Sequence, residues 1–74
     1  MCPLTAAPEG VPLQVASLGG GGSFRKRLAD LGIVPGATIT LVRSGAPLLL
    51  ALGESRFALG GGMAHKIFVL PEKH

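Results

Sequence analysis

The fold is decided by residues 24–37, which read Phe24-Arg25-Lys26-Arg27-Leu28-Ala29-Asp30-Leu31-Gly32-Ile33-Val34-Pro35-Gly36-Ala37. This stretch predicts a short helix, then a forced stop, then the beginning of a strand. Within it, Phe24, Leu28 and Leu31 fall at i, i+4 and i+7, so a helix places them on one face. We expect this apolar face to close one end of a small hydrophobic core.

The two ends of this helix carry residues with well-defined backbone roles. The Ser23 hydroxyl can accept a hydrogen bond from the first exposed amides, which predicts an N-terminal cap. Gly32 suits a left-handed C-terminal cap, and Pro35 prevents the helix from resuming. Pro35-Gly36 favours a tight turn, and the alternation of residues 38–41 is typical of a strand. The sequence therefore predicts a capped helix between strands.

The composition bounds the size and class of the protein. The chain has 74 residues, of which 47% are hydrophobic and 15% charged, and this balance argues against disorder. We expect a single domain over residues 1–74, with a core at residues 8–70, a short arm before it and a short tail after it. The longest apolar run, residues 47–52, is far shorter than the roughly 20 residues of a membrane span.

Charge and cysteine usage point to a compartment and to a kind of partner. The N-terminus has no basic flank followed by an apolar segment, so no signal peptide is expected. The only cysteine, Cys2, has no partner for an internal disulfide, which favours the reducing cytoplasm. The net charge of +3 suggests a partner with an acidic surface.

Short apolar runs separated by turn residues predict five strands. Val11, Leu13 and Val15 alternate with Pro12, Gln14 and Ala16, which predicts a first strand with one buried face, and Pro12 belongs at the start of that strand or at a sheet edge. Residues 48–52 show no alternation, so we expect this strand to be buried on both faces. Residues 19–22, all glycine, predict a flexible turn before the helix. The five predicted strands cover residues 11–16, 37–43, 48–52, 56–59 and 66–70, with a single helical turn at 63–65.

Five short strands with glycine-rich turns favour a small barrel, because closure removes the exposed edges of a sheet. The predicted fold class is mainly β, a small SH3-like five-stranded barrel with one short α-helix inserted after the first strand. An OB-like barrel is the second possibility. The chain has no internal repeat and no linker that would divide it.

A signature at residues 25–36 is followed by shorter matches at Ala46-Pro47, Phe57-Ala58-Leu59, Ala64 and Ile67-Phe68-Val69. With these motifs the chain resembles the FeoA family, which comprises small cytoplasmic accessory proteins of bacterial ferrous-iron transport. The resemblance covers residues 8–70, and its central helix-to-turn segment is the most specific part.

The resemblance implies an SH3-like barrel that catalyses no reaction and needs no cofactor. Its implied partner is the cytosolic part of FeoB, a membrane iron transporter with a cytosolic GTP-binding domain. The contact would regulate or assemble the transporter. It would also bring the protein to the inner face of the cell membrane, reaching the membrane only through FeoB.

The candidate partner-binding residues are the basic triplet Arg25, Lys26 and Arg27 together with Leu49 and Leu50 of the leucine-rich strand. On a helix, Lys26 points away from the apolar face and its two neighbours flank it. One interpretation of the triplet is a solvated helix face with Asp30 close by. A second is a docking patch for an acidic protein, and a third is a site for a phosphate backbone.

No metal site, cofactor site or catalytic set is predicted. Cys2, His65 and His74 are widely separated and lack the spacing of metal ligands, although the implied transport pathway handles a transition metal. The glycines at 19–22 and Ser23 form neither a Walker motif nor a dinucleotide fingerprint, because no Lys-Ser or Lys-Thr pair follows and Phe24 replaces the last glycine.

Two further functions remain as alternatives to the FeoB contact. One is a nucleic-acid-binding SH3-like or OB-like barrel, although exposed aromatic residues for base stacking are not expected, since all three phenylalanines suit the core. The other is self-association into a homo-oligomer through the leucine-rich strand. Binding to nucleic acid would weaken steeply with added salt, whereas binding to a protein would be selective for one partner.

Overall fold

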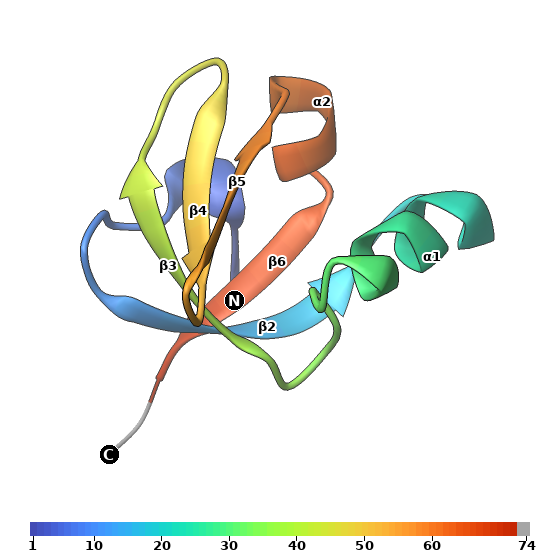
Figure 1. Ribbon diagram of the computed structural model, residues 1–74, viewed down its shortest axis with the longest axis horizontal. Helices are drawn as coiled ribbons and strands as arrows, with labels where there is room; N and C mark the ends of the chain where they lie inside the picture. Colours follow the sequence, from blue (N-terminus) through green and yellow to red (C-terminus); the bar gives the residue numbers. More distant parts are fainter. Residues whose placement is uncertain (73–74) are drawn as a thin grey trace.

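The computed structural model describes residues 1–72, and its six strands form one antiparallel sheet (Figure 1). Neighbouring strands follow the order β1-β6-β2-β3-β4-β5. Short helical segments connect several of them. In chain order the elements are β1 (Cys2–Pro3), η1 (Leu4–Ala6), β2 (Pro12–Leu18), α1 (Gly22–Asp30), β3 (Thr38–Arg43), β4 (Leu48–Leu52), β5 (Ser55–Leu59), α2 (Gly61–Ala64) and β6 (Ile67–Pro71).

The core lies between strands whose buried residues alternate with exposed or half-buried ones. In β2, for example, Leu13 and Val15 are each 1% exposed, whereas Pro12 and Gln14 face solvent. Val11 was expected on the same buried face, but it lies before β2 and is exposed, so this expectation was wrong. In Figure 1, β3 and β4 run across the direction of β2, so their inner faces enclose a common interior. The buried apolar residues form a single cluster: Leu4, Ala7, Leu13, Val15, Leu28, Ile33, Ile39, Leu41, Leu48, Leu50, Leu59, Ala64, Ile67 and Val69.

The N-terminal arm belongs to the sheet, which is a difference from the expected five strands. β1 pairs with β6, where Cys2 lies opposite Val69 and Pro3 opposite Phe68. Leu4 is completely buried, so core packing holds the arm in place beyond its two-residue strand. Pro3 has no backbone N–H, and it is tolerated because β1 is at the edge of the sheet. The predicted lower bound of the core at residue 8 was therefore wrong.

The other five strands, β2 to β6, confirm the predicted ones to within two residues at each end. β2 begins at Pro12, which places the proline at the start of its strand as expected. α1 follows β2, the first of these five strands, and therefore sits where the sequence predicted the inserted helix.

Helix α1 begins earlier than expected. Ser23 lies inside the helix, and the N-cap is Gly21, whose backbone is extended at φ −84° and ψ 175°. This cap has no side-chain hydrogen bond, so the predicted Ser23 cap was wrong. The Arg25 N–H donates to the Gly21 carbonyl at 3.2 Å and begins the helical pattern two residues earlier. Glycine is accepted at this position because it adopts the cap conformation freely.

The C-terminal end of α1 closes as the sequence predicted. Gly32 has φ +89°, in the left-handed region. Its N–H donates to the Ala29 carbonyl at 2.9 Å, and the Ile33 N–H donates to the Leu28 carbonyl at 2.8 Å. These two bonds form a Schellman motif, which satisfies carbonyls that the helix leaves open. Leu28 and Ile33 flank the motif and are both fully buried.

The apolar face of α1 differs from the expected set at one position. Leu28 is buried and Phe24 packs partly against the core, but Leu31 is 38% exposed. Ile33 is buried in its place. Because the chain leaves the helix at Gly32, helical spacing no longer decides which residue beyond this point faces the core.

Strand β4 is an alternating strand, not one that is buried on both faces. Leu48 and Leu50 are at most 1% exposed, whereas Leu49 and Leu52 are half-buried. The expectation of two buried faces was therefore wrong, since the outer side of the sheet meets solvent at this strand. β4 and β5 form a hairpin, in which Leu52 pairs with Ser55 across a two-residue loop.

A side-chain clamp joins the loop before β2 to the connection between β3 and β4. The Glu9 carboxylate accepts hydrogen bonds from the Ser44 backbone N–H at 2.6 Å and from the Ser44 hydroxyl at 2.8 Å. These bonds favour the ionised carboxylate and lower the pKa of Glu9 from its ordinary value of 4.5, with a smaller contribution from the charge of Arg43. The adjacent Gly10 N–H donates to the Leu41 carbonyl at 2.8 Å.

Replacing Glu9 with glutamine should lower the free energy of unfolding at neutral pH, and its difference from the parent should shrink in acid. A depressed folded-state pKa gives stability that is present above the unfolded pKa of 4.5 and lost as the pH falls through the lower folded value. Urea unfolding at neutral pH and in a series below pH 4.5 measures this change. A difference that stays constant in acid would contradict the clamp.

Replacing Gly32 with alanine should lower the free energy of unfolding by at least about 1–2 kcal/mol, the usual cost of a left-handed backbone. The added Cβ would also lie 2.8 Å from Leu52 Cδ2. Gly36→Ala is the matched control, because Gly36 has φ +94° but no heavy atom within 4 Å of the added Cβ. Thermal or urea unfolding should show the larger loss at Gly32; equal losses would mean that Leu52 gives way without cost.

Candidate functional site

The basic triplet lies on the exposed part of α1. Arg25, Lys26 and Arg27 are all exposed. In Figure 1, α1 stands at one end of the molecule, next to the end of β2 and well apart from β4. The triplet therefore places three exposed cations on one helix, about 100° apart around its axis. Whether this surface binds a partner stays a prediction.

The N-terminal part of α1 and the glycines before it contact Lys66, the residue immediately before β6. The Lys66 ammonium lies over the Phe24 ring, 5.3 Å from its centroid, a geometry that favours a cation–π attraction. The Gly19 N–H donates to the Lys66 carbonyl at 2.7 Å. Gly20 has φ +83°, and a Cβ there would lie 3.1 Å from the Phe24 ring. The glycine segment thus includes closely packed positions that a purely flexible turn would not have.

A groove runs between α1 and the second half of β2. It has a volume of about 390 Å³ and is open to solvent. Of the triplet, only Arg25 lines it; Lys26 and Arg27 do not. Its walls are Ala16, Ser17 and Leu18 of β2, Arg25 and Ala29 of α1, and Val34 and Pro35 of the following turn.

The sequence did not indicate this groove. Val34 and Pro35 suggested only a turn, and the irregular register of β2 between Val15 and Ser17 left no trace in the amino-acid pattern. The one available signal was the i, i+4 spacing of Arg25 and Ala29, which places a cation and a small residue on one helix face.

The two leucines of the predicted site lie on opposite faces of β4. Leu49 is half-buried and pairs with Ala58 of β5. Leu50 is 0% exposed and belongs to the core cluster, so its assignment to a partner-binding surface was wrong. The alternation of a strand sends successive side chains to opposite faces, and one of the two leucines had to point inward. Neither leucine lines the groove beside α1.

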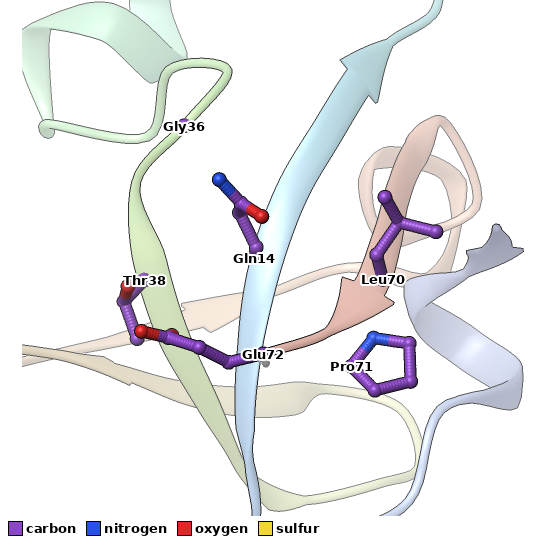
Figure 2. A pocket seen from close by; sticks show the side chains of 6 residues that line it. All are labelled: Gln14, Gly36, Thr38, Leu70, Pro71 and Glu72. Atoms are coloured by element: carbon purple, nitrogen blue, oxygen red, sulfur yellow. The ribbon is translucent and has the colours of Figure 1, made fainter. Parts of the chain in front are cut away.

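A second groove, with a volume of about 490 Å³, is lined by Gln14 of β2, by Gly36 and Thr38, and by the end of the chain at Leu70, Pro71 and Glu72. Figure 2 shows the Glu72 side chain reaching toward Thr38, with Gln14 beside them. Within the described part of the chain, one Glu72 carboxylate oxygen is buried without a hydrogen-bond partner. Because this oxygen is itself covered, a ligand reaches it only if Glu72 moves, and we assign no ligand to this groove.

Residues 1–72 contain no group of three or more His, Cys, Asp or Glu side chains that could hold a metal ion. Cys2 is half-buried as a free thiol in β1, and His65 is exposed after α2. His74 lies outside the described residues. No helix within that described part has the length and apolarity needed to cross a membrane.

The family model for the FeoA domain matches residues 2–71. The chain belongs to the FeoA family. The match begins at the arm that pairs as β1, and it ends at the last residue of β6. Membership links the protein to ferrous iron transport. FeoA proteins are small accessory domains and are not a known enzyme family.

Several solved FeoA structures are similar to this FeoA chain. An iron uptake regulatory protein (FeoA) shares 35% identity at a TM-score of 0.82, with 90% of this chain and 92% of that chain covered. FeoA of Stenotrophomonas maltophilia, complexed with zinc, shares 30% identity at a TM-score of 0.75, with 89% and 86% covered. The Chlorobium tepidum FeoA protein shares 27% identity at a TM-score of 0.82, with 92% and 68% covered.

The Stenotrophomonas protein is described as a procaryotic SH3 domain protein. Together with the mainly β sheet found here, this similarity confirms the predicted SH3-like fold class. The comparison with curated proteins gave no significant match.

Alanine substitutions at Leu49 and Leu50 test whether the two leucines lie on opposite faces of β4. Leu50→Ala should lower the free energy of unfolding by about 2–5 kcal/mol, the usual cost of truncating a fully buried leucine. Leu49→Ala should cost clearly less, because Leu49 is only half-buried. Chemical unfolding of both variants measures the difference. Equal losses would show that the two faces of β4 contribute alike.

Proposed function

We propose that this FeoA protein is a non-enzymatic accessory factor of ferrous iron uptake that binds the cytosolic part of the FeoB transporter. Family membership supports the link to ferrous iron transport. The proposed contact regulates or assembles the transporter and takes place at the cytoplasmic face of the membrane. The protein reaches the membrane through FeoB alone.

The observation that carries the proposal is the exposed basic triplet on a helix anchored at both ends. The Schellman motif anchors the C-terminal end, and the packing of Phe24 with Lys66 anchors the N-terminal end. A surface that is already ordered loses less entropy on binding than a flexible one. Three adjacent cations also speed the approach of an acidic partner surface.

A regulatory role is supported by a relative. The Stenotrophomonas maltophilia FeoA protein, 30% identical to this chain, is described as a candidate ferrous iron transport activating factor. For this chain, regulation through the GTP cycle of FeoB is the form of the proposal that calorimetry can test. The protein is titrated into the purified cytosolic domain of FeoB with and without a non-hydrolysable GTP analogue.

Saturable binding that depends on the nucleotide supports a regulatory contact, and saturable binding without that dependence supports an assembly role. Absence of binding across temperatures and concentrations contradicts the proposal for the cytosolic domain. Titration with unrelated duplex DNA over a salt series tests the nucleic-acid alternative, because phosphate contacts weaken steeply as salt rises. Sedimentation of the protein alone tests self-association.

Reversing one charge of the triplet should weaken the FeoB contact without unfolding the protein. Lys26→Glu is expected to lower the affinity several-fold at low salt, mainly through slower association, because exposed charges steer encounter. Surface plasmon resonance at two salt concentrations measures both rates. Arg56→Glu on β5 is the matched control, since Arg56 is also exposed and the charge change is identical. Equal affinities for both variants would remove the helix surface from the proposal.

A further inference from the structure

The second half of β2 has a strand partner on only one side. On the β3 side, the ladder ends at Gln14, and two further bonds join Val15 to the carbonyl of Ala37 and the N–H of Gly36, each at 2.8 Å. Beyond this point, Ser17 and Leu18 pair with β6 alone. Within residues 1–72, the opposite edge of this half-strand therefore has no neighbouring strand.

The groove beside α1 lies along this open edge. Val34 and Pro35 immediately precede the residues that bond to Val15, so the chain diverges from β2 at this position. The register shift between Val15 and Ser17 marks a bulge, and bulges bend a strand and increase its twist. Figure 1 shows the end of β2 pointing toward α1 while the chain before β3 turns away from it. The groove therefore opens at the position where β3 would otherwise continue alongside β2.

The groove beside α1 is lined by both a charged side chain and apolar side chains. Arg25 and Ala29 contribute one face of α1, so a single guanidinium stands beside the open strand edge. Val34 is 40% exposed, which is unusual for a valine next to a core. Leu18 is half-buried and packs against the core cluster.

We propose that this groove binds a short extended segment of a partner protein, which adds as a strand to the open edge of β2 and places a carboxylate on Arg25. Strand addition satisfies main-chain groups that have no partner on this side, and the alternate side chains of the segment meet Leu18 and Val34. The identity of the partner as FeoB rests on the proposed function above; the mode of binding does not.

An acidic extended segment fits better than a helix or a basic segment. A helix satisfies its own main-chain hydrogen bonds and would leave the β2 edge unpaired. The chain has a net charge of +3, and Lys26 and Arg27 follow Arg25, which lines the groove. These charges favour a negatively charged segment. A planar guanidinium also pairs with a carboxylate through two parallel hydrogen bonds.

The probe is an N-acetylated, fluorescein-labelled hexapeptide of alternating valine and glutamate. Its binding is followed by fluorescence anisotropy and by amide chemical shifts of the full chain in NMR. We expect saturable binding, with the largest shifts at residues 16–18, and slower hydrogen exchange of edge amides there. The same peptide methylated on alternate backbone nitrogens, and a valine–lysine peptide, should each bind at least about tenfold more weakly.

Arg25 and Lys26 are a matched pair, since both are exposed cations on α1 and only Arg25 lines the groove. Arg25→Ala should weaken binding of the valine–glutamate peptide about tenfold, through faster dissociation, because it removes a charge-assisted hydrogen bond. Lys26→Ala should change dissociation less than about twofold, because it removes only long-range attraction. Ala29→Phe, which fills the groove, should abolish binding while the thermal midpoint of folding stays within a few degrees.

Equal binding of the methylated peptide, equal effects of Arg25→Ala and Lys26→Ala, or shifts away from residues 16–18 would each overturn the strand-addition mode. The same variants are titrated with the FeoB cytosolic domain to separate the two proposals. If FeoB binds and the valine–glutamate peptide does not, the groove inference fails and the proposed function stands. If the peptide binds as expected and FeoB does not, the proposed function fails and the groove stands.

Discussion

The structure depends on the way in which α1 ends. The left-handed Gly32 and the two Schellman hydrogen bonds turn the chain back toward the core, so that Leu28 and Ile33 are buried together. If the helix continued past Gly32, the chain would carry Ile33 away from the core and the turn before β3 would not form. This junction therefore fixes where α1 ends and where the chain returns to the core.

The candidate site depends on the same junction. Because the chain turns at Gly32, Val34 and Pro35 come to lie opposite the second half of β2 and form one wall of the groove. Phe24 and Lys66 are in contact near the other end of the helix, so Arg25 projects from an element that is held at both ends. A small domain with limited core can therefore present a well-ordered cationic surface.

Much of the fold was predictable, because the local backbone preferences favoured the same strands and turns that the sheet contains. Gly32, the Pro35-Gly36 turn and the alternation of Leu13 and Val15 each act over a few residues, and the observed β2 to β6 follow them. For the N-terminal arm, a long-range contact decided. Leu4 is buried by pairing of the arm with β6, at the far end of the chain, and no local pattern announces such a pairing.

The sequence by itself determined a mainly β small domain, the position of the helix and the presence of three adjacent cations, since these follow from residue type and spacing within short segments. Only the tertiary structure decided that Arg25 faces a groove, that Leu50 is buried and that half of β2 keeps an open edge. These features arise where residues far apart in the chain meet, and strand register and helix orientation are set by the packing of the whole core.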